Sequence, residues 1–125
     1  MKKIINTRMA PEAQGPYSQA IKIKGMLFCS GQLPIDPMSG NLVTDSVAEQ
    51  TQRVMENLKA VVEASGFTLD DIVKTTIFIT DLSFFSEVNK VYESYFKETF
   101  PARSTVQVSA LPKGASVEIE AIAYR

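Results

Sequence analysis

A strand that is apolar on both of its faces most constrains the fold of this chain. Residues Asp71 to Thr80 are rich in β-branched side chains, which favour strands, and successive side chains alternate between the two faces of a strand. One face carries Val73, Thr75, Ile77 and Ile79, and the other carries Ile72, Lys74, Thr76 and Phe78. Because both faces carry apolar bulk, the sheet that contains this strand needs cover on each side.

The rest of the chain predicts two helices and five further strands. Ser46 is an N-cap, and apolar residues recur every three or four positions behind it, which predicts an amphipathic helix to about Ser65. Ser83 is expected to cap a second helix, from Phe84 to about Thr99, whose aromatic stripe, including Tyr92, we assign to the core. Strands are predicted at Lys3 to Asn6, Ala20 to Lys24, Met26 to Ser30, 101 to 108 and 117 to 123.

These elements, in the order β-β-β-α-β-α-β-β, indicate one domain of the α+β class. Two helices suffice to cover one face of a single mixed sheet of five or six strands. The opposite face is then left bare, and it is expected to carry Ile72, Phe78, Ile122 and Tyr124. A chain of 125 residues is too short to form a third layer over this face. We therefore expect this face to be buried against other subunits of a homo-oligomer.

Composition excludes several classes of chemistry. The chain has no histidine and one cysteine, Cys29, so a histidine-based triad and the usual zinc sites are excluded, and we expect no metal. The formal net charge of −1 gives no general attraction to nucleic acid or to an anionic membrane. No stretch approaches the roughly 20 apolar residues of a membrane span, and the first residues do not form a signal peptide. We therefore expect a cytoplasmic protein with a buried, inert thiol.

One arginine and two glutamates are the strongest candidates in the sequence for binding or catalysis. Arg103 lies where the second helix gives way to a strand, and Glu118 and Glu120 share one face of the last strand because they are two residues apart. We expect these two strands to lie side by side, so that the guanidinium group faces a carboxylate. Two interpretations stay open: Arg103 binds a substrate carboxylate, or it balances a buried acid.

Two loop features also have alternative interpretations. The stiff segment Gly15-Pro16-Tyr17-Ser18 either presents Tyr17 outward or packs its own loop down. Gly31, at the end of a strand, marks either a close approach of the backbone to another group or a simple bulge. Taken alone, the local sequence favours packing for Tyr17, and it does not decide between the alternatives for Gly31.

Five segments, in this order along the chain, carry a resemblance to a known family. They are Ala10-Pro11 with Gly15-Pro16-Tyr17-Ser18-Gln19, Ser30-Gly31-Gln32-Leu33-Pro34, Asp71-Ile72-Val73-Lys74-Thr75-Thr76, Phe100-Pro101-Ala102-Arg103-Ser104, and Val117-Glu118-Ile119-Glu120-Ala121-Ile122-Ala123. From about Ile5 to Arg125 the chain resembles the reactive-intermediate imine deaminases, the RidA/YjgF group. The resemblance implies a fold like that of trimeric chorismate mutase, with three sheets packed into a central barrel and active sites in the clefts between subunits.

The resemblance also implies an activity. The family hydrolyses the C=N bond of 2-imino acids such as 2-iminobutanoate and 2-iminopropanoate, and it releases a 2-oxo acid and ammonia. It uses no cofactor. The implied source of these reactive enamines and imines is a pyridoxal-phosphate-dependent dehydratase that acts on threonine or serine.

Matching positions imply roles for individual residues. Arg103 binds the substrate carboxylate through two parallel hydrogen bonds, and Glu118 orients the attacking water and moves a proton to the departing nitrogen. Tyr17 is expected to reach over the substrate from the neighbouring subunit. Glu120 is expected to be more deeply buried, structural and ion-paired. The remaining implied substrate contacts are Ser30, Gly31, Asn89 and Thr105.

Three positions depart from the pattern of many relatives. Thr105 replaces a cysteine, a change that is tolerated if the main chain makes the contact, and Gln107 and Ala110 replace a glutamate and an arginine. The joint loss of that acid and base leaves the substrate range open. Two other functions also stay open: a regulatory module that binds a small carboxylate without turnover, and an RNA-cleaving inhibitor of translation. The acidic composition and the missing histidine disfavour the second.

Overall fold

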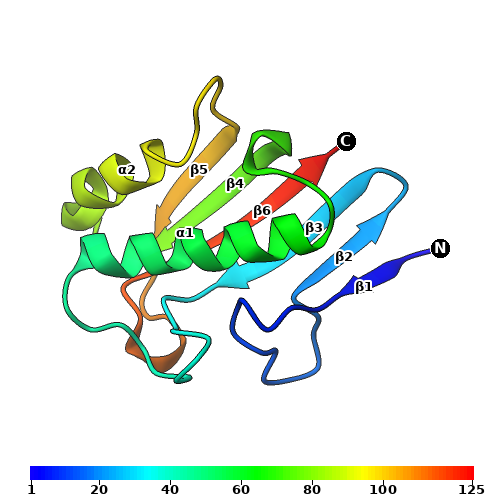
Figure 1. Cartoon of the computed structure of the whole chain (residues 1–125). Coiled ribbons are helices and arrows are strands. Elements are labelled where there is room, and N and C mark those ends of the chain that lie inside the picture. The colour runs from blue at the N-terminus through cyan, green and yellow to red at the C-terminus, as the bar shows by residue number, and fades with distance from the viewer.

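A computed structural model describes residues 1–125, which form one six-stranded sheet with two helices (Figure 1). Along the chain the elements are β1 (Lys3–Ile5), β2 (Ala20–Ile23), β3 (Met26–Gln32), α1 (Val47–Ala64), β4 (Ile72–Ile79), α2 (Phe85–Glu93), β5 (Ala102–Gln107) and β6 (Val117–Tyr124). Across the sheet the order is β1-β2-β3-β6-β4-β5, and only β4 and β5 pair in parallel. The predicted order of elements and the mixed sheet are confirmed.

Both helices cover the same face of the sheet (Figure 1). The apolar side of α1 packs there, and Val54, Leu58 and Val61 are fully buried. The strands contribute Leu27, Ile77, Ile79, Val117 and Ile119 to the same core. The predicted two-layer α+β arrangement is therefore confirmed. Neither helix has the length and apolar character that a membrane crossing requires.

β5 and β6 are not neighbours, so the prediction that they lie side by side is wrong. β4 lies between them: Thr75 of β4 pairs with Arg103 of β5 on one side and with Ala121 of β6 on the other. α2 carries the chain from β4 to β5 as a crossover, and such a connection joins parallel strands. β6 instead occupies the place between β3 and β4 and pairs antiparallel with both.

The second helix differs from its prediction at both ends. A single 3-10 turn precedes it, in which the Asp81 carboxylate accepts the N–H of Ser83 at 2.9 Å, so Asp81 caps this turn and the predicted cap by Ser83 is wrong. α2 ends at Glu93, well before the predicted Thr99. The Ser94 hydroxyl donates to a carbonyl of the last turn at 2.6 Å, and serine competes in this way for the acceptors of a helical backbone.

An irregularity in β4 changes which side chains face the core. The register with β6 shifts between Ile72 and Lys74, so that Ile72 is buried while Val73 is 47% exposed. The prediction that Ile72 lies on the uncovered face is therefore wrong, because a bulge reverses the alternation of side chains. Beyond the bulge, Thr75 and Ile77 are buried as predicted.

The face of the sheet opposite the helices has no covering layer within the chain. The large apolar side chains exposed on the strands are Ile4, Phe28, Val73, Val106 and Tyr124. Phe78 and Ile122 on the same face are only half-buried, and Ile122 pairs directly with Phe28. An uncovered sheet face with several exposed apolar side chains is typical of an interface.

A buried asparagine that the sequence pattern did not single out anchors the segment after β3. Asn57 of α1 is fully buried, and its amide nitrogen donates to the carbonyls of Leu33 and Ile35 at 3.0 and 2.9 Å. The side-chain oxygen of Asn57 accepts a hydrogen bond from Arg53 Nε at 3.1 Å. These bonds determine the path of the chain as it leaves β3, next to the first of two clefts.

Candidate functional site

The first cleft contains four of the seven predicted site residues. It has a volume of about 610 Å³ and lies between the loop that precedes β2 and the ends of β3 and β6. Its lining includes Tyr17, Ser30, Gly31, Glu118 and Glu120. The fold therefore brings together a loop aromatic, a strand-end glycine and a carboxylate that are far apart in the sequence.

Gly31 leaves the space that the Glu118 side chain occupies. β3 continues through Gly31 to Gln32, and its register with β6 shifts between Cys29 and Gln32. A Cβ atom at position 31 would lie 2.8 Å from the carboxyl carbon of Glu118, which is closer than non-bonded carbon atoms approach. Both interpretations of Gly31 are confirmed: the strand is irregular there, and its backbone closely approaches another group.

The Glu118 carboxyl lies in an environment that favours its protonated form. Burial raises the pKa of Glu118 above the ordinary value for a glutamate, and the negative charge of Glu120 raises it further. Glu120 itself is exposed, and the chain's one ion pair joins Arg125 to Asp71, so the prediction of a buried, ion-paired Glu120 is wrong. A raised pKa makes Glu118 a stronger base, which suits a group that accepts a proton and returns it.

A buried glutamine holds the loop that carries Tyr17. The amide nitrogen of Gln19 donates to the carbonyl of Thr7 at 3.0 Å, and its oxygen accepts the N–H of the same residue at 2.7 Å. The Ser30 hydroxyl donates to the carbonyl of Ser18 at 2.6 Å and ties the loop to β3. Tyr17 remains 54% exposed, and its hydroxyl accepts the N–H of Gln14 at 3.3 Å, so it both faces outward and packs against its own loop.

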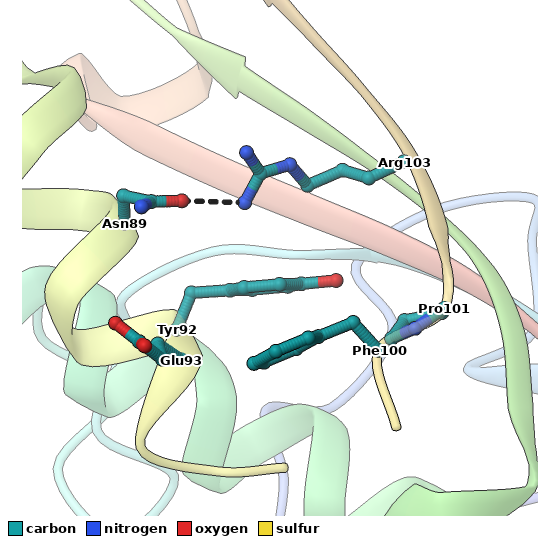
Figure 2. A pocket seen from close by; sticks show the side chains of 6 residues that line it. All are labelled: Asn89, Tyr92, Glu93, Phe100, Pro101 and Arg103. Carbon is teal, nitrogen blue, oxygen red and sulfur yellow. Dashed lines mark hydrogen bonds between the residues drawn. The ribbon is translucent and has the colours of Figure 1, made fainter.

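The second cleft surrounds Arg103 (Figure 2). It has a volume of about 440 Å³, and its lining is Asn89, Tyr92, Glu93, Phe100, Pro101 and Arg103. Arg103 Nη1 donates to the side-chain oxygen of Asn89 at 2.7 Å, and the guanidinium carbon lies 5.1 Å from the centre of the Tyr92 ring. Arg103 forms no ion pair within the chain, so it does not balance Glu118 or Glu120 of the same chain.

The two clefts lie on opposite faces of the sheet. Arg103 pairs with Thr75, whose side chain is buried beneath the helices. Glu118 of β6 pairs with Phe78 of β4, and both side chains lie on the uncovered face. β4 also separates β6 from β5, the strand that carries Arg103. A small substrate therefore cannot touch Arg103 and Glu118 of the same chain at once. The predicted site residues form two groups: Tyr17, Ser30, Gly31 and Glu118 in one, and Asn89 and Arg103 in the other.

Thr105 does not line either cleft. It lies on the edge strand β5 and pairs with Ile77 of β4, and its hydroxyl is the one buried side-chain polar atom without a hydrogen-bond partner. Main-chain contact with a substrate stays a prediction for this residue. Gln107 accepts the N–H of Leu82 with its side-chain oxygen at 2.8 Å, a contact that needs no charge.

Sequence reasoning assigned Tyr92 to the core and missed its place in the second cleft. Tyr92 is indeed buried and packs against Phe96 in a tilted arrangement with ring centres 4.9 Å apart, but it also lies against Arg103. A signal was present: Asn89 and Tyr92 are three residues apart, which places both on one face of a helix. Their spacing alone did not reveal that this face is directed at β5.

Comparisons with known proteins agree over nearly the whole chain. Residues 7–125 match the family model described as Endoribonuclease L-PSP. A RutC family protein of Pyrococcus horikoshii is 50% identical over 125 residues, which cover 100% of this chain and 99% of that protein. The 2-iminobutanoate/2-iminopropanoate deaminase of Salmonella typhimurium is 50% identical over 128 residues, which cover 100% of this chain and 99% of that protein. The human protein of that name is 44% identical over 125 residues, which cover 100% of this chain and 91% of the human protein.

Solved structures share the same fold. A crystal structure of TdcF from E. coli with bound serine superposes with a TM-score of 0.95 at 48% identity and covers 98% of both chains. The crystal structure of RidA from an Antarctic Psychrobacter species superposes with a TM-score of 0.95 at 46% identity and covers 98% of this chain and 99% of that one.

Proposed function

The chain belongs to the Endoribonuclease L-PSP family, which includes the reactive-intermediate deaminases of the RidA/YjgF group, and we propose that it is a 2-imino acid deaminase. It hydrolyses 2-iminobutanoate and 2-iminopropanoate to 2-oxo acids and ammonia. Two relatives named 2-iminobutanoate/2-iminopropanoate deaminase, which are 44% and 50% identical to this chain, support the proposal. The two groups of site residues support it as well.

The unpaired guanidinium of Arg103 carries this proposal. It is half-buried, it is held by a neutral amide and by aromatic rings, and no carboxylate of the chain neutralises it. A guanidinium has five N–H donors in a planar fork, and Asn89 occupies one of them. The remaining donors suit a ligand carboxylate, which accepts two parallel, charge-assisted hydrogen bonds from such a group.

Hydrolysis then needs only a positioned base. Arg103 binds the carboxylate of the imino acid, and the Glu118 carboxylate accepts a proton from water as its oxygen bonds to C2 of the C=N group. Glu118 returns that proton to the nitrogen of the carbinolamine. The regenerated Glu118 carboxylate then accepts the hydroxyl proton as the C=O bond forms, the C–N bond breaks and ammonia leaves, and this second proton passes to the ammonia. Positioning and charge supply most of the acceleration, because a protonated imine is intrinsically electrophilic.

The site is proposed to form between the subunits of a homotrimer. The uncovered sheet face supplies the interface, and a head-to-tail contact brings the Arg103 group of one subunit to the Tyr17 and Glu118 group of its neighbour. This arrangement resolves the separation of Arg103 and Glu118 on opposite faces. The substrates are those that a pyridoxal-phosphate-dependent threonine or serine dehydratase releases.

The proposed activity is tested in a coupled assay. Threonine dehydratase generates the imine, and the release of 2-oxobutanoate and ammonia is followed with and without this protein. The deaminase is expected to speed product release in proportion to its concentration. Tight binding of 2-oxobutanoate without any acceleration would instead identify a regulatory module that binds small carboxylates.

Replacing Gly31 with alanine is expected to displace the Glu118 carboxylate and to lower kcat/KM by about tenfold to 100-fold. The atoms that the new methyl group meets belong to the flexible end of Glu118 rather than to the backbone, so the fold and the melting temperature should change little. The matched control is Gly40→Ala. Its methyl group meets open space, but its backbone φ of +77° strains any side chain, so it should lose stability and keep activity. A Gly31→Ala variant of unchanged activity would contradict the assigned place of Glu118.

A further inference from the structure

Tyr92 contacts both Arg103 and the residue beside it in the sheet. Its ring centre lies 5.1 Å from the guanidinium carbon, and Figure 2 shows the ring between Arg103 and Phe100. Its hydroxyl lies 2.7 Å from the hydroxyl of Thr75. Thr75 is the partner of Arg103 in the β4–β5 ladder. One side chain of α2 is therefore fastened to β4 at the position where the arginine leaves β5.

The hydroxyl pair is buried and satisfied. Thr75 is fully buried, Tyr92 is 3% exposed, and each hydroxyl serves as the partner of the other. Burial raises the pKa of Tyr92 above its ordinary value, although Thr75 and Arg103 act in the opposite direction. The ring is therefore neutral, and it meets Arg103 through its π-face and not as a counter-ion.

Two further residues of α2 complete the support of the guanidinium group. Phe85 lies with its ring centre 5.5 Å from the guanidinium carbon, and Asn89 accepts the hydrogen bond from Nη1. Phe85, Asn89 and Tyr92 are four and three residues apart, so they share one face of the helix. Aromatic rings and one amide thus limit the directions in which the remaining N–H donors can point.

We propose that Tyr92 and Thr75 are positioning residues, whose hydroxyl pair holds the Tyr92 ring against Arg103 and so orients the guanidinium group toward the substrate carboxylate. This inference rests on the proposed function of Arg103. It differs from a purely structural role, in which Tyr92 only fills the core beside Phe96 and its loss changes stability alone.

Four variants separate the two roles. Tyr92→Phe and Thr75→Val each remove one hydroxyl, the double variant removes both, and Tyr92→Leu removes the aromatic ring. Calorimetry with 2-oxobutanoate measures Kd, the coupled assay measures KM and kcat, and thermal unfolding measures stability. Tyr95→Phe is the matched control, because the Tyr95 hydroxyl lies 2.7 Å from Glu56 and Tyr95 does not line the Arg103 cleft.

The expected results differ in kind. Tyr92→Leu should raise Kd and KM by about tenfold to 30-fold and leave kcat within about twofold, because the lost contact acts on carboxylate binding. Tyr92→Phe and Thr75→Val should each raise Kd by about threefold, and the double variant should be no worse than either, since one bond is shared. Loss of stability with an unchanged Kd in Tyr92→Leu, as expected for the Tyr95→Phe control, would overturn the proposal.

A second readout does not depend on catalysis. The chain has four arginines, so the Nε–H signal of Arg103 is identified in nitrogen-15 spectra as the one that Arg103→Lys removes. We expect it to be distinct and slow to exchange in the wild type, and to shift toward the signal of exposed Arg8 in Tyr92→Leu. If the wild type neither binds 2-oxobutanoate nor hydrolyses imines, the proposed function fails while this signal still decides the positioning role. An unchanged signal in Tyr92→Leu would overturn that role.

Discussion

Replacing Arg103 with lysine is expected to lower kcat/KM for 2-iminobutanoate by about 100-fold, although the positive charge is kept. Lysine supplies a point charge and cannot offer two parallel donors to a carboxylate. It also cannot keep both the hydrogen bond to Asn89 and the contact with the face of Tyr92 that hold the guanidinium group in place. Arg103→Ala removes charge and geometry together, so its loss should exceed that of the lysine variant.

Steady-state kinetics in the coupled assay, together with calorimetric Kd values for 2-oxobutanoate, test this expectation. Arg8→Lys is the matched control, because Arg8 is an exposed loop residue that lines neither cleft. A lysine variant within about threefold of the wild type would show that charge alone is sufficient, and the assigned role of the guanidinium fork would be wrong.

Replacing Glu118 with glutamine is expected to lower kcat by about 100-fold to 10,000-fold, because the amide cannot accept the proton of the attacking water. The side chain keeps its size and its place beside Gly31, so substrate binding should change far less than kcat. Glu63→Gln, an exposed change on α1, is the matched control. If Glu118→Gln kept the kcat of the wild type, Glu118 would not be the proton acceptor of the reaction.

The same change should make the protein more stable at neutral pH. The pKa of Glu118 is raised in the folded state, so the folded chain holds this proton more tightly than the unfolded chain does. Ionisation above that pKa therefore opposes folding, and the penalty disappears as the pH falls through the pKa. Glu118→Gln removes the penalty at pH 7 and should raise the melting temperature there, with a smaller gain in acid.

The pH dependence of activity follows from the same shift. Glu118 acts as a base in its ionised form, so kcat/KM should fall as the pH drops through its pKa, at a higher pH than for an ordinary glutamate. Glu120→Gln removes a negative charge that raises this pKa and should move the acid limb to lower pH. An acid limb at the same pH in Glu120→Gln would contradict the coupling between the two carboxylates.

The fold was predictable where the signals are local. The first hairpin and α1 follow from turn residues, a serine cap and a helical stripe, and the structure has them within a few residues of the predicted limits. The neighbours of β5 were not predictable in this way, because strand pairing is decided by contacts between distant parts of the chain. The register shift between Ile72 and Lys74 was also not predictable from the sequence. A pattern of alternating side chains is extended along the whole strand unless a bulge is already known.

The candidate site shows the same division. Arg103, Glu118 and Gly31 could be singled out one at a time, because an unusual residue type at a strand end is visible in the sequence. Their grouping was wrong: Arg103 and Glu118 were expected to face each other across adjacent strands and lie instead on opposite faces. Tyr92 was missed because an aromatic residue in a helical stripe packs the core in the same pattern that it uses to support a ligand-binding group.

Mixing two inactive variants tests the central claim, that Arg103 of one subunit works with Glu118 of the next. Arg103→Ala and Glu118→Gln proteins are dissociated, combined in equal amounts and reassembled. An interface is functional when its arginine comes from the Glu118→Gln chain and its glutamate from the Arg103→Ala chain, so random assembly should restore about one quarter of wild-type activity. Each variant reassembled alone is the control. If both residues acted within one chain, every site would lack one of them, and a mixture as inactive as its components would contradict the account.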